Sequence, residues 1–548
     1  MKGMKKLIVF AILTCIAAIA FVGCKKNAAV SNDPNYPIEI SVFIGSGTQP
    51  SDNNKTFKYL KEKFNVTFKW DILVGDLYQK RGTMIAGGIY PDLIEINETA
   101  FIDAGAVIPL DDLIDKYAPN LKKHYAENWN KMKHTDGKVY CLVNYGIIHG
   151  VEQGAFYNGS AFWVQKAVLK DAGYPKVTTV DGFFDMIENY YRKNPTINGQ
   201  PTIPFTVITE DWRAFELWNP PNFLAGNPNE GNGVVNPTTY EYKNFFTMDI
   251  SKRWFKKLNE MNAKGLVDRS AFTDNYDQYI AKISTGRALS LFGQQWQFDS
   301  TENAKADRGE YIRTMAPLPV VFDNSITPKY RTESIPNLGR GFGISVSCKD
   351  PVRIIRFLDA YMAEENLRTM QWGIEGQDWQ YNAQKIPYRT QQQRENWQSQ
   401  AWQDANRAGL WQGMAPKLEG SFSDGYPSDL SDYYPEREGM LRPEDRELFA
   451  AYNVAGYAQM MAKEPQKNSI WYPTWNMVNP PDGSPAQIAL QRCEQTMKRL
   501  LPQLILTQPS NFDKLWDEYV KEMEVTNNIS AYEQYMTSMV KQRVKDWS

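Results

Sequence analysis

The chain has 548 residues, with 61 Lys and Arg against 63 Asp and Glu, and 13% of its residues are aromatic. This length is enough for two or three lobes, each with a sizeable core. The near balance of charge, without a Lys- or Arg-rich run, argues against a nucleic-acid binder.

The N-terminus has the pattern of a secretory signal over residues 1–23. Three lysines precede an apolar run from 7 to 22, which is shorter than a membrane-spanning helix. The four residues that end at Cys24 resemble the bacterial lipobox, so we expect lipidation of Cys24 as the mature N-terminus. A plain secretory signal with a chance Cys is the alternative. Residues 24–36 are polar and predict a flexible tether.

The next hundred residues predict βαβ units and a mainly parallel sheet. Their apolar patterns and glycine breaks give strands at 38–44, 66–70 and 93–96, and helices at 55–64 and 77–86. Ligands of such sheets bind beyond the carboxyl ends of the strands. The polar residues at these ends are Ser46, Thr48, Asn97 and Glu98.

A second α/β region follows, and the C-terminal part is helical. The patterns predict helices at 162–172, 179–193, 251–264 and 276–284, with strands at 205–208 and 288–292. A strand at 342–346 and a helix at 351–366 return to the first pattern. Residues 370–480 have weak periodicity, and helices are expected at 487–505, 512–525 and 530–544.

Metal and nucleophile motifs are missing from the sequence. The cysteines after Cys24 are far apart and odd in number, and the three histidines form no HExxH pattern. GxSxG and GxxxxGK[ST] are also absent. These features argue against a zinc enzyme or a Ser-His-Asp hydrolase, whereas a two-carboxylate glycosidase stays open. The many Trp and Tyr rings suit sugar stacking in an extracytoplasmic protein, with core packing as the ordinary alternative.

Several segments together resemble family 1 extracellular solute-binding proteins of ABC importers. The most specific is Met-Ile-Ala-Gly-Gly-Ile-Tyr-Pro-Asp-Leu-Ile at 84–94, which resembles the family pattern A-G-x-x-P-D-L-I. Further blocks match in order at 60–66, 107–120, 136–140, 169–175, 286–293, 350–359 and 516–520. The nearest likeness is to the large oligosaccharide-binding lipoproteins of Firmicutes, and a remoter one is to maltose-binding protein.

This resemblance implies a periplasmic-binding-protein-like type II fold, with two α/β lobes joined by hinge strands and a ligand cleft between them. Lobe 1 would hold 36–146 plus 340–372, and lobe 2 would hold 147–339 plus 373–548 with a C-terminal helical extension. The hinge would lie near Asn144–Gly150, Asn337–Gly341 and Gly373–Gly376, where glycines absorb dihedral changes.

The implied function is that of a monomeric receptor, lipid-anchored to the outer face of the bacterial cell membrane. It would capture an oligosaccharide by lobe closure and deliver it to ABC permease subunits, without catalysis. Three alternatives stay open: a secreted glycoside hydrolase or lyase, a mostly helical glycan-binding lipoprotein, and a receptor for a peptide, lipid or other non-sugar ligand.

The resemblance also points to candidate ligand-binding residues. The turn that ends at Trp296 resembles a turn of maltose-binding protein whose Trp stacks on sugar. Trp372 and Trp379 bracket a segment that resembles one near the family's cleft. Trp212 and Trp218 are candidates from the sequence itself, because they flank a Pro-containing loop after a predicted strand.

No metal is expected. Many large relatives carry a calcium loop in lobe 2, but residues 194–204 place Asn at the first acidic position and lack the later acids. Calcium needs several carboxylate oxygens, so this loop predicts no strong site.

Overall fold

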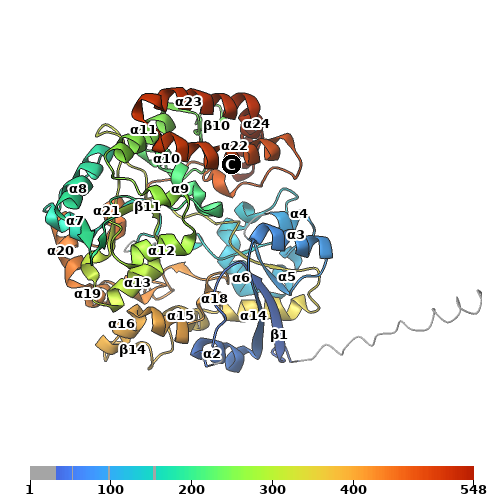
Figure 1. Ribbon diagram of the computed structural model, residues 1–548. Helices are drawn as coiled ribbons and strands as arrows, with labels where there is room; N and C mark the ends of the chain where they lie inside the picture. Colours follow the sequence, from blue (N-terminus) through green and yellow to red (C-terminus); the bar gives the residue numbers. More distant parts are fainter. Residues whose placement is uncertain (1–32, 52, 97–98, 152–155) are drawn as a thin grey trace, which may run out of the picture.

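A computed structural model describes residues 33–548 except 52, 97–98 and 152–155. The predicted signal, Cys24, Asn97 and Glu98 therefore lie outside the described residues. The described chain forms two α/β lobes (Figure 1). Within it, no helix has the length and apolar character needed to cross a membrane.

Lobe 1 is built on a five-stranded sheet of order β2-β1-β3-β13-β4. β1 runs parallel to β2 and β3, which confirms the βαβ pattern, and β13 is antiparallel to its two neighbours. The strands are β1 (Ile38–Ile44), β2 (Val66–Ile72), β3 (Leu93–Ile96), β4 (Leu142–Val143) and β13 (Gly341–Ile344). All four side chains of β3 are buried, as expected for a central strand covered on both faces.

Local signals in the sequence explain the ends of the connecting helices. Asn54 accepts the N–H groups of Thr56 and Phe57 at the start of α2 (Lys55–Phe64), and Asn65 ends it in the left-handed conformation. α3 (Leu77–Gly87) begins at the Asp76 cap and ends at Gly88 with a positive φ.

Further helices complete lobe 1. They are α4 (Ala100–Asp103), α5 (Asp111–Tyr117), α6 (Pro119–Tyr125), the 3-10 helix η1 (Ala126–Met132), α14 (Pro351–Tyr361), α15 (Glu364–Trp372), α16 (Gln391–Gln398), α17 (Gln400–Asn406) and α18 (Gly409–Gln412). The single helix predicted at 351–366 is thus two helices. The chain turns between them at Met362 and Ala363, and the extended backbone of Ala363 starts the second helix.

Lobe 2 contains a three-stranded sheet of order β11-β6-β12, in which β6 is antiparallel to both neighbours. The strands are β6 (Ser160–Gln165), β11 (Ser290–Gln294) and β12 (Met315–Leu318). The helix predicted from residue 162 is wrong at its start, because 160–165 form β6 and α7 (Lys166–Asp171) begins only afterwards. Every side chain of β6 is buried, and a short apolar run covered on both faces has no period that separates strand from helix.

The strand predicted at 205–208 forms only isolated bridges, from Phe205 to Val267 and from Thr206 to Leu291. The main helices of lobe 2 lie where the sequence predicts them. They are α8 (Val180–Lys193), α11 (Asp249–Ala263), α12 (Tyr276–Ser284), α22 (Pro485–Leu506), α23 (Phe512–Lys521) and α24 (Ile529–Trp547). Figure 1 shows the last three as a red layer over one side of this lobe.

Shorter elements connect these parts. They are α9 (Phe215–Trp218), α10 (Pro220–Leu224), α13 (Asp299–Asp307), α19 (Tyr434–Met440), α20 (Pro443–Tyr452) and α21 (Tyr457–Met461), with the 3-10 helices η2 (Asp211–Ala214), η3 (Arg269–Phe272), η4 (Gln295–Gln297) and η6 (Leu430–Asp432). The short strand pairs are β7 (Thr196–Ile197) with β8 (Gln200–Pro201), β9 (Gly233–Val235) with β10 (Tyr242–Asn244), β14 (Gln380–Tyr381) with β15 (Pro387–Tyr388), and β5 (Ile148–His149) with β16 (Glu419–Gly420).

Two chain crossings run side by side between the lobes. The N–H of Asn144 donates to the carbonyl of Arg340 (3.0 Å), and the N–H of Asn337 donates to the carbonyl of Tyr145 (2.9 Å). The backbone is close here: a Cβ on Gly146, whose φ is +87°, would lie 1.7 Å from the Ile335 carbonyl oxygen. These crossings therefore need glycine at this position.

The division of the C-terminal half differs from the prediction. Most buried apolar side chains from Trp379 to Leu430 join the core of lobe 1, and most of those from Leu448 onward join the core of lobe 2. The crossing predicted at Gly373–Gly376 is therefore wrong, because Trp372 and Trp379 on either side of it pack in lobe 1. The third crossing lies between Leu430 and Leu448.

Candidate functional site

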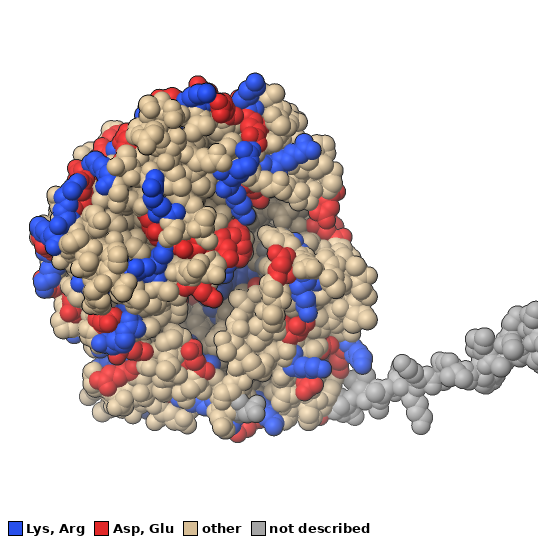
Figure 2. Space-filling model, in the orientation of Figure 1, with Lys and Arg blue, Asp and Glu red and all other residues tan. Residues whose placement is uncertain are grey.

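A cleft of about 960 Å³ lies between the two lobes, and residues from both lobes and from the crossings line it. Figure 2 shows the hollow between the two halves, with acidic side chains along its rim. Lobe 1 contributes the loop after β1 together with α17, α18 and residues 417–432, and lobe 2 contributes Phe156, Asn158 and Asp299. The crossings contribute Tyr145, Ile148, Ser334 and Arg340.

The loop after β1 forms one part of the lobe 1 wall. Ser46 and Thr48 are exposed and line the cleft. The sequence predicts this position, because both residues follow the carboxyl end of β1. The N–H of Gly45 donates to a Glu95 carboxylate oxygen (2.5 Å), and this contact ties the loop to β3. Burial raises the pKa of Glu95.

Arg407 is a cation in the wall of the cleft. Its guanidinium carbon lies 4.2 Å from the ring centroid of Trp397, and Arg389 lies 4.0 Å from the same ring. Among the described residues, no hydrogen bond or ion pair of the Arg407 side chain is found, and burial lowers its pKa. A ligand that enters the cleft would give this guanidinium an oxygen acceptor.

Asp432 also lines the cleft, near the end of η6. Burial and then the charge of Asp429 raise the pKa of Asp432, against the opposing charge of Arg437. The shift favours the neutral carboxyl, which can donate a hydrogen bond. One of its oxygens, Oδ1, is buried and has no partner within the described residues.

Two exposed indoles of lobe 2 stack next to the cleft. The rings of Trp212 and Trp296 have centroids 5.9 Å apart and planes 9° apart. Trp212 is 44% exposed and Trp296 is 40% exposed. Trp296 borders the cleft, because the N–H of the preceding Gln295 donates to the carbonyl of Asn158 and Asp299 follows three residues later. We call this pair the indole platform.

The other predicted tryptophans are not available to a ligand in this conformation. Trp372 is 0% exposed and Trp379 is 2% exposed, and their rings meet edge to face in the lobe 1 core. Trp218 is 5% exposed and packs in the lobe 2 core. These three rings therefore pack in the core, whereas the sequence suggested that they contact the ligand.

Several cleft residues have no signal in the sequence. Arg407, Asp429 and Asp432 come from the weakly periodic region 370–480, and packing onto lobe 1 brings them to the cleft. Residues 194–204 form the tight hairpin β7–β8, with Asn198 and Gly199 at positive φ. Among the described residues, no group of three His, Cys, Asp or Glu side chains could hold a metal ion.

Two α/β lobes with a polar cleft between them define the class of two-lobed ligand receptors. The family model described as bacterial extracellular solute-binding protein matches residues 55–374. The chain belongs to this family, which confirms the resemblance read from its sequence.

A curated relative and two solved structures support the same fold. The fructooligosaccharide ABC transporter substrate-binding protein FusA of Streptococcus pneumoniae serotype 4 is 26% identical over 300 residues, which is 49% of this chain and 53% of FusA. The chain thus spans about half the length of this relative. The crystal structure of alginate-binding protein AlgQ2 without calcium ion has a TM-score of 0.63 and 16% identity, over 92% of this chain and 98% of that one.

FusA of S. pneumoniae in complex with kestose has a TM-score of 0.61 and 20% identity, over 92% of this chain and 99% of that one. These likenesses confirm the predicted type II fold.

Proposed function

We propose that this protein is an extracytoplasmic receptor that captures an oligosaccharide by lobe closure and delivers it to an ABC importer. The observation that carries the proposal is the cleft, with a polar wall on lobe 1 and the indole platform beside it on lobe 2. The likeness to a fructooligosaccharide transporter protein and to an alginate-binding protein supports a sugar as the ligand.

The two walls suit the two kinds of surface that a sugar offers. The hydroxyls of Ser46 and Thr48 and the guanidinium of Arg407 can exchange hydrogen bonds with sugar hydroxyls, each of which needs a partner when it loses water. The flat apolar faces of sugar rings can stack on Trp212 and Trp296. Because a ligand contacts both walls only when the lobes close, binding favours the closed form.

The proposed location and partners rest on the sequence. Cys24 would carry the lipid that holds the protein at the outer face of the cell membrane, and two permease subunits would recognise the closed monomer. A Cys24→Ala variant should be released from the membrane, whereas wild-type protein should label with a radioactive fatty acid. Labelling of the Cys24→Ala variant would contradict this assignment.

A thermal-shift screen of the protein without residues 1–24 tests the function. A ligand that binds only folded protein raises the melting temperature by mass action. We expect a shift with one class of oligosaccharide, which mass spectrometry should recover intact. A shift with cleaved sugar would make the protein an enzyme, and no shift with any glycan would favour a peptide or lipid ligand.

A further inference from the structure

The indole platform is built from two segments that are far apart in sequence. Trp212 belongs to the short 3-10 helix η2, and Trp296 belongs to the three-residue 3-10 helix η4. Each ring has a local contact: the indole N–H of Trp296 donates to the Gln294 side chain (2.6 Å), and the ring of Trp212 stacks on that of Phe215. Neither contact joins the two segments, so the near-parallel arrangement of the rings also depends on a contact that reaches both.

Tyr276, the first residue of α12, contacts both segments. Its N–H donates to a carboxylate oxygen of Glu210 (2.5 Å), two residues before Trp212. Its hydroxyl donates to the carbonyl of Gln297 (2.5 Å), the residue after Trp296. Burial raises the pKa of Tyr276, so this phenol stays a donor across the physiological range.

Arg213 completes the connection on the Trp212 side. Its guanidinium carbon lies 4.2 Å from the ring centroid of Tyr276 and 4.7 Å from that of Trp212. An ion pair with Asp211 (3.0 Å) holds the guanidinium in place. The cation thus links the ring of Tyr276 to the first indole, at distances typical of cation–π contacts.

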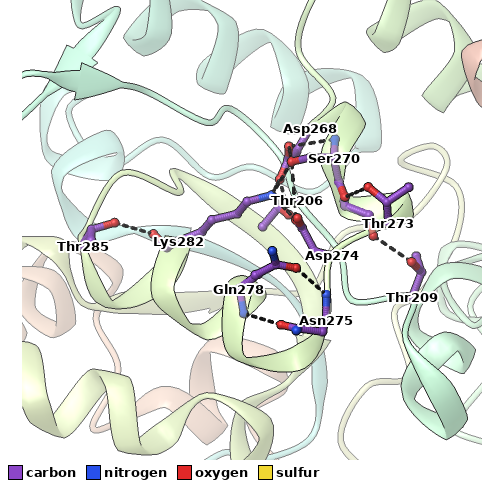
Figure 3. A network of polar contacts seen from close by, with 11 residues as sticks. Thr206, Thr209, Asp268, Ser270, Thr273, Asp274, Asn275, Gln278, Lys282 and Thr285 are labelled. Atoms are coloured by element: carbon purple, nitrogen blue, oxygen red, sulfur yellow. Dashed lines mark hydrogen bonds and ion pairs between the residues drawn. The ribbon is translucent and has the colours of Figure 1, made fainter.

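The start of α12 is itself anchored. Asn275 and Gln278 form a reciprocal capping box around the first turn. Figure 3 shows the side chain of Lys282 reaching back from the same helix toward Asp268, Ser270 and Asp274. The buried ammonium lies 2.6 Å from Asp268 Oδ2 and from Ser270 Oγ, and it also pairs with Asp274.

A further bond in this network reaches the loop before Trp212. The hydroxyl of Thr209 donates to the carbonyl of Ala271 (2.7 Å) (Figure 3). The start of α12, which includes Tyr276, is therefore anchored to the same network as the loop before Trp212.

We propose that Tyr276 is a positioning residue that holds the rings of Trp212 and Trp296 in their near-parallel arrangement before any ligand arrives. The role of Tyr276 in ligand binding rests on the proposed function, whereas its effect on the positions of the two rings does not. A ring pair fixed in advance loses less conformational freedom when the ligand binds, and affinity rises for that reason. Tyr276 itself need not contact the ligand.

Fluorine NMR of protein labelled with 5-fluorotryptophan tests this role without a ligand. Trp212→Phe and Trp296→Phe variants assign the two signals among those of the 16 tryptophans. Each ring shifts the signal of its stacked neighbour. Tyr276→Phe removes only the hydroxyl bond to the Gln297 carbonyl, so we expect it to move or broaden the Trp296 signal and, through the changed stacking, the Trp212 signal, and to leave the remaining signals in place.

Tyr140→Phe is the matched control, because it also removes one phenol hydrogen bond, to Asp136 (2.7 Å), but in lobe 1. It should leave the platform signals unchanged. Unchanged platform signals in Tyr276→Phe would overturn the proposal. If Tyr276→Phe does not fold, Arg213→Met replaces it, and the proposal fails if that variant keeps both signals in place.

Binding of kestose is the second readout. Tyr276→Phe should weaken it about 5- to 10-fold, because the cost of ordering the rings would then fall on binding, and loss of the internal hydrogen bond should lower the melting temperature slightly. Wild-type affinity in this variant would count against the role in binding. If kestose does not bind wild-type protein, the sugar proposal loses support, and the fluorine signals still decide the role of Tyr276.

Discussion

The two walls of the cleft are built in opposite ways. The lobe 1 wall is polar and draws Arg407, Asp429 and Asp432 from a late segment that packs onto the first sheet. The lobe 2 wall has few lining side chains, and beside it two indoles stack on short turns. A sugar has both hydroxyl groups and flat apolar faces, so one ligand can use both walls.

This difference separates two kinds of binding energy. Hydrogen bonds to the lobe 1 wall replace bonds to water, so each adds little in net terms but rejects ligands that lack the matching group. Stacking on lobe 2 removes apolar surface from water and depends less on the identity of the sugar. We therefore expect lobe 2 to set most of the affinity and lobe 1 to set most of the specificity.

The largest effect is expected from Trp212→Ala combined with Trp296→Ala. Removal of the platform should weaken glycan binding at least about 30-fold, because truncation of a central aromatic anchor typically costs about 2 kcal/mol or more. Isothermal titration calorimetry measures the change. Trp475→Ala is the control, since Trp475 has a similar exposed fraction (43%) but lies in residues 474–476 and is not part of the stacked pair. An equal loss of glycan affinity in Trp475→Ala would mean that the platform has no specific role in binding.

Each lobe also holds a buried acid whose ionisation destabilises the fold. Burial raises the pKa of Glu216 in lobe 2 to about 8 from an ordinary value of 4.5. Between these two values the native state binds more protons than the unfolded state, so stability falls as pH rises through this window and levels off above it. Glu216→Gln should remove at least about 2 kcal/mol of this fall.

Denaturant unfolding of both proteins at pH 5 and pH 8 measures this difference. Asp432→Asn is the lobe 1 counterpart, because burial and the charge of Asp429 also raise the pKa of Asp432. If the two lobes unfold in separate transitions, each variant should flatten the pH dependence of its own lobe. The same pH dependence in wild type and in Glu216→Gln would contradict this prediction.

Arg407→Met sharpens the comparison from the side of lobe 1. Methionine keeps the apolar contact with Trp397 and removes the donors, so glycan affinity should fall about 10-fold or more, because a hydrogen bond from a charged group is worth about 1.5 kcal/mol or more. The loss should differ among glycans more than the loss from the platform variants does. Arg192→Met, on the exposed face of α8, is the control. If Arg407→Met loses the same affinity for every glycan, Arg407 does not contribute to specificity.

The smallest expected effect lies in the crossings. Gly146→Ala should destabilise the protein by about 1 kcal/mol or more beyond Gly105→Ala, as measured by thermal unfolding. Both glycines have positive φ, but an added Cβ meets the Ile335 carbonyl only at Gly146 and nothing within 4 Å at Gly105. Equal destabilisation would mean that backbone conformation alone, and not the close crossing, requires Gly146.

The first sheet and the long helices could be predicted from the sequence because their signals are local. Alternation in β1, the caps of α2 and the period of α8 each lie within one element. The start of β6 could not be predicted from the sequence, because a strand that is buried on both faces has no alternation of apolar and polar residues. The family resemblance indicated Trp296, whose exposed ring lies at the cleft margin.

The lobe 1 wall could not be predicted because it depends on tertiary packing. Arg407 and Asp432 come from a segment without periodicity, and only the packing of residues 379–433 onto lobe 1 brings them beside Ser46 and Thr48. For Trp372 and Trp379, the sequence predicted contact with the ligand, but both rings are buried in the core of lobe 1. Sequence position near a cleft segment does not tell whether a ring faces the cleft or the core.

Calorimetric titration of the protein without residues 1–24 tests the central claim that one oligosaccharide uses both walls. The best glycan from the thermal screen should bind in a 1:1 complex and be recovered intact. Trp296→Ala and Arg407→Met should each weaken binding of that same glycan. Wild-type affinity in either variant, or a cleaved product, would contradict the account.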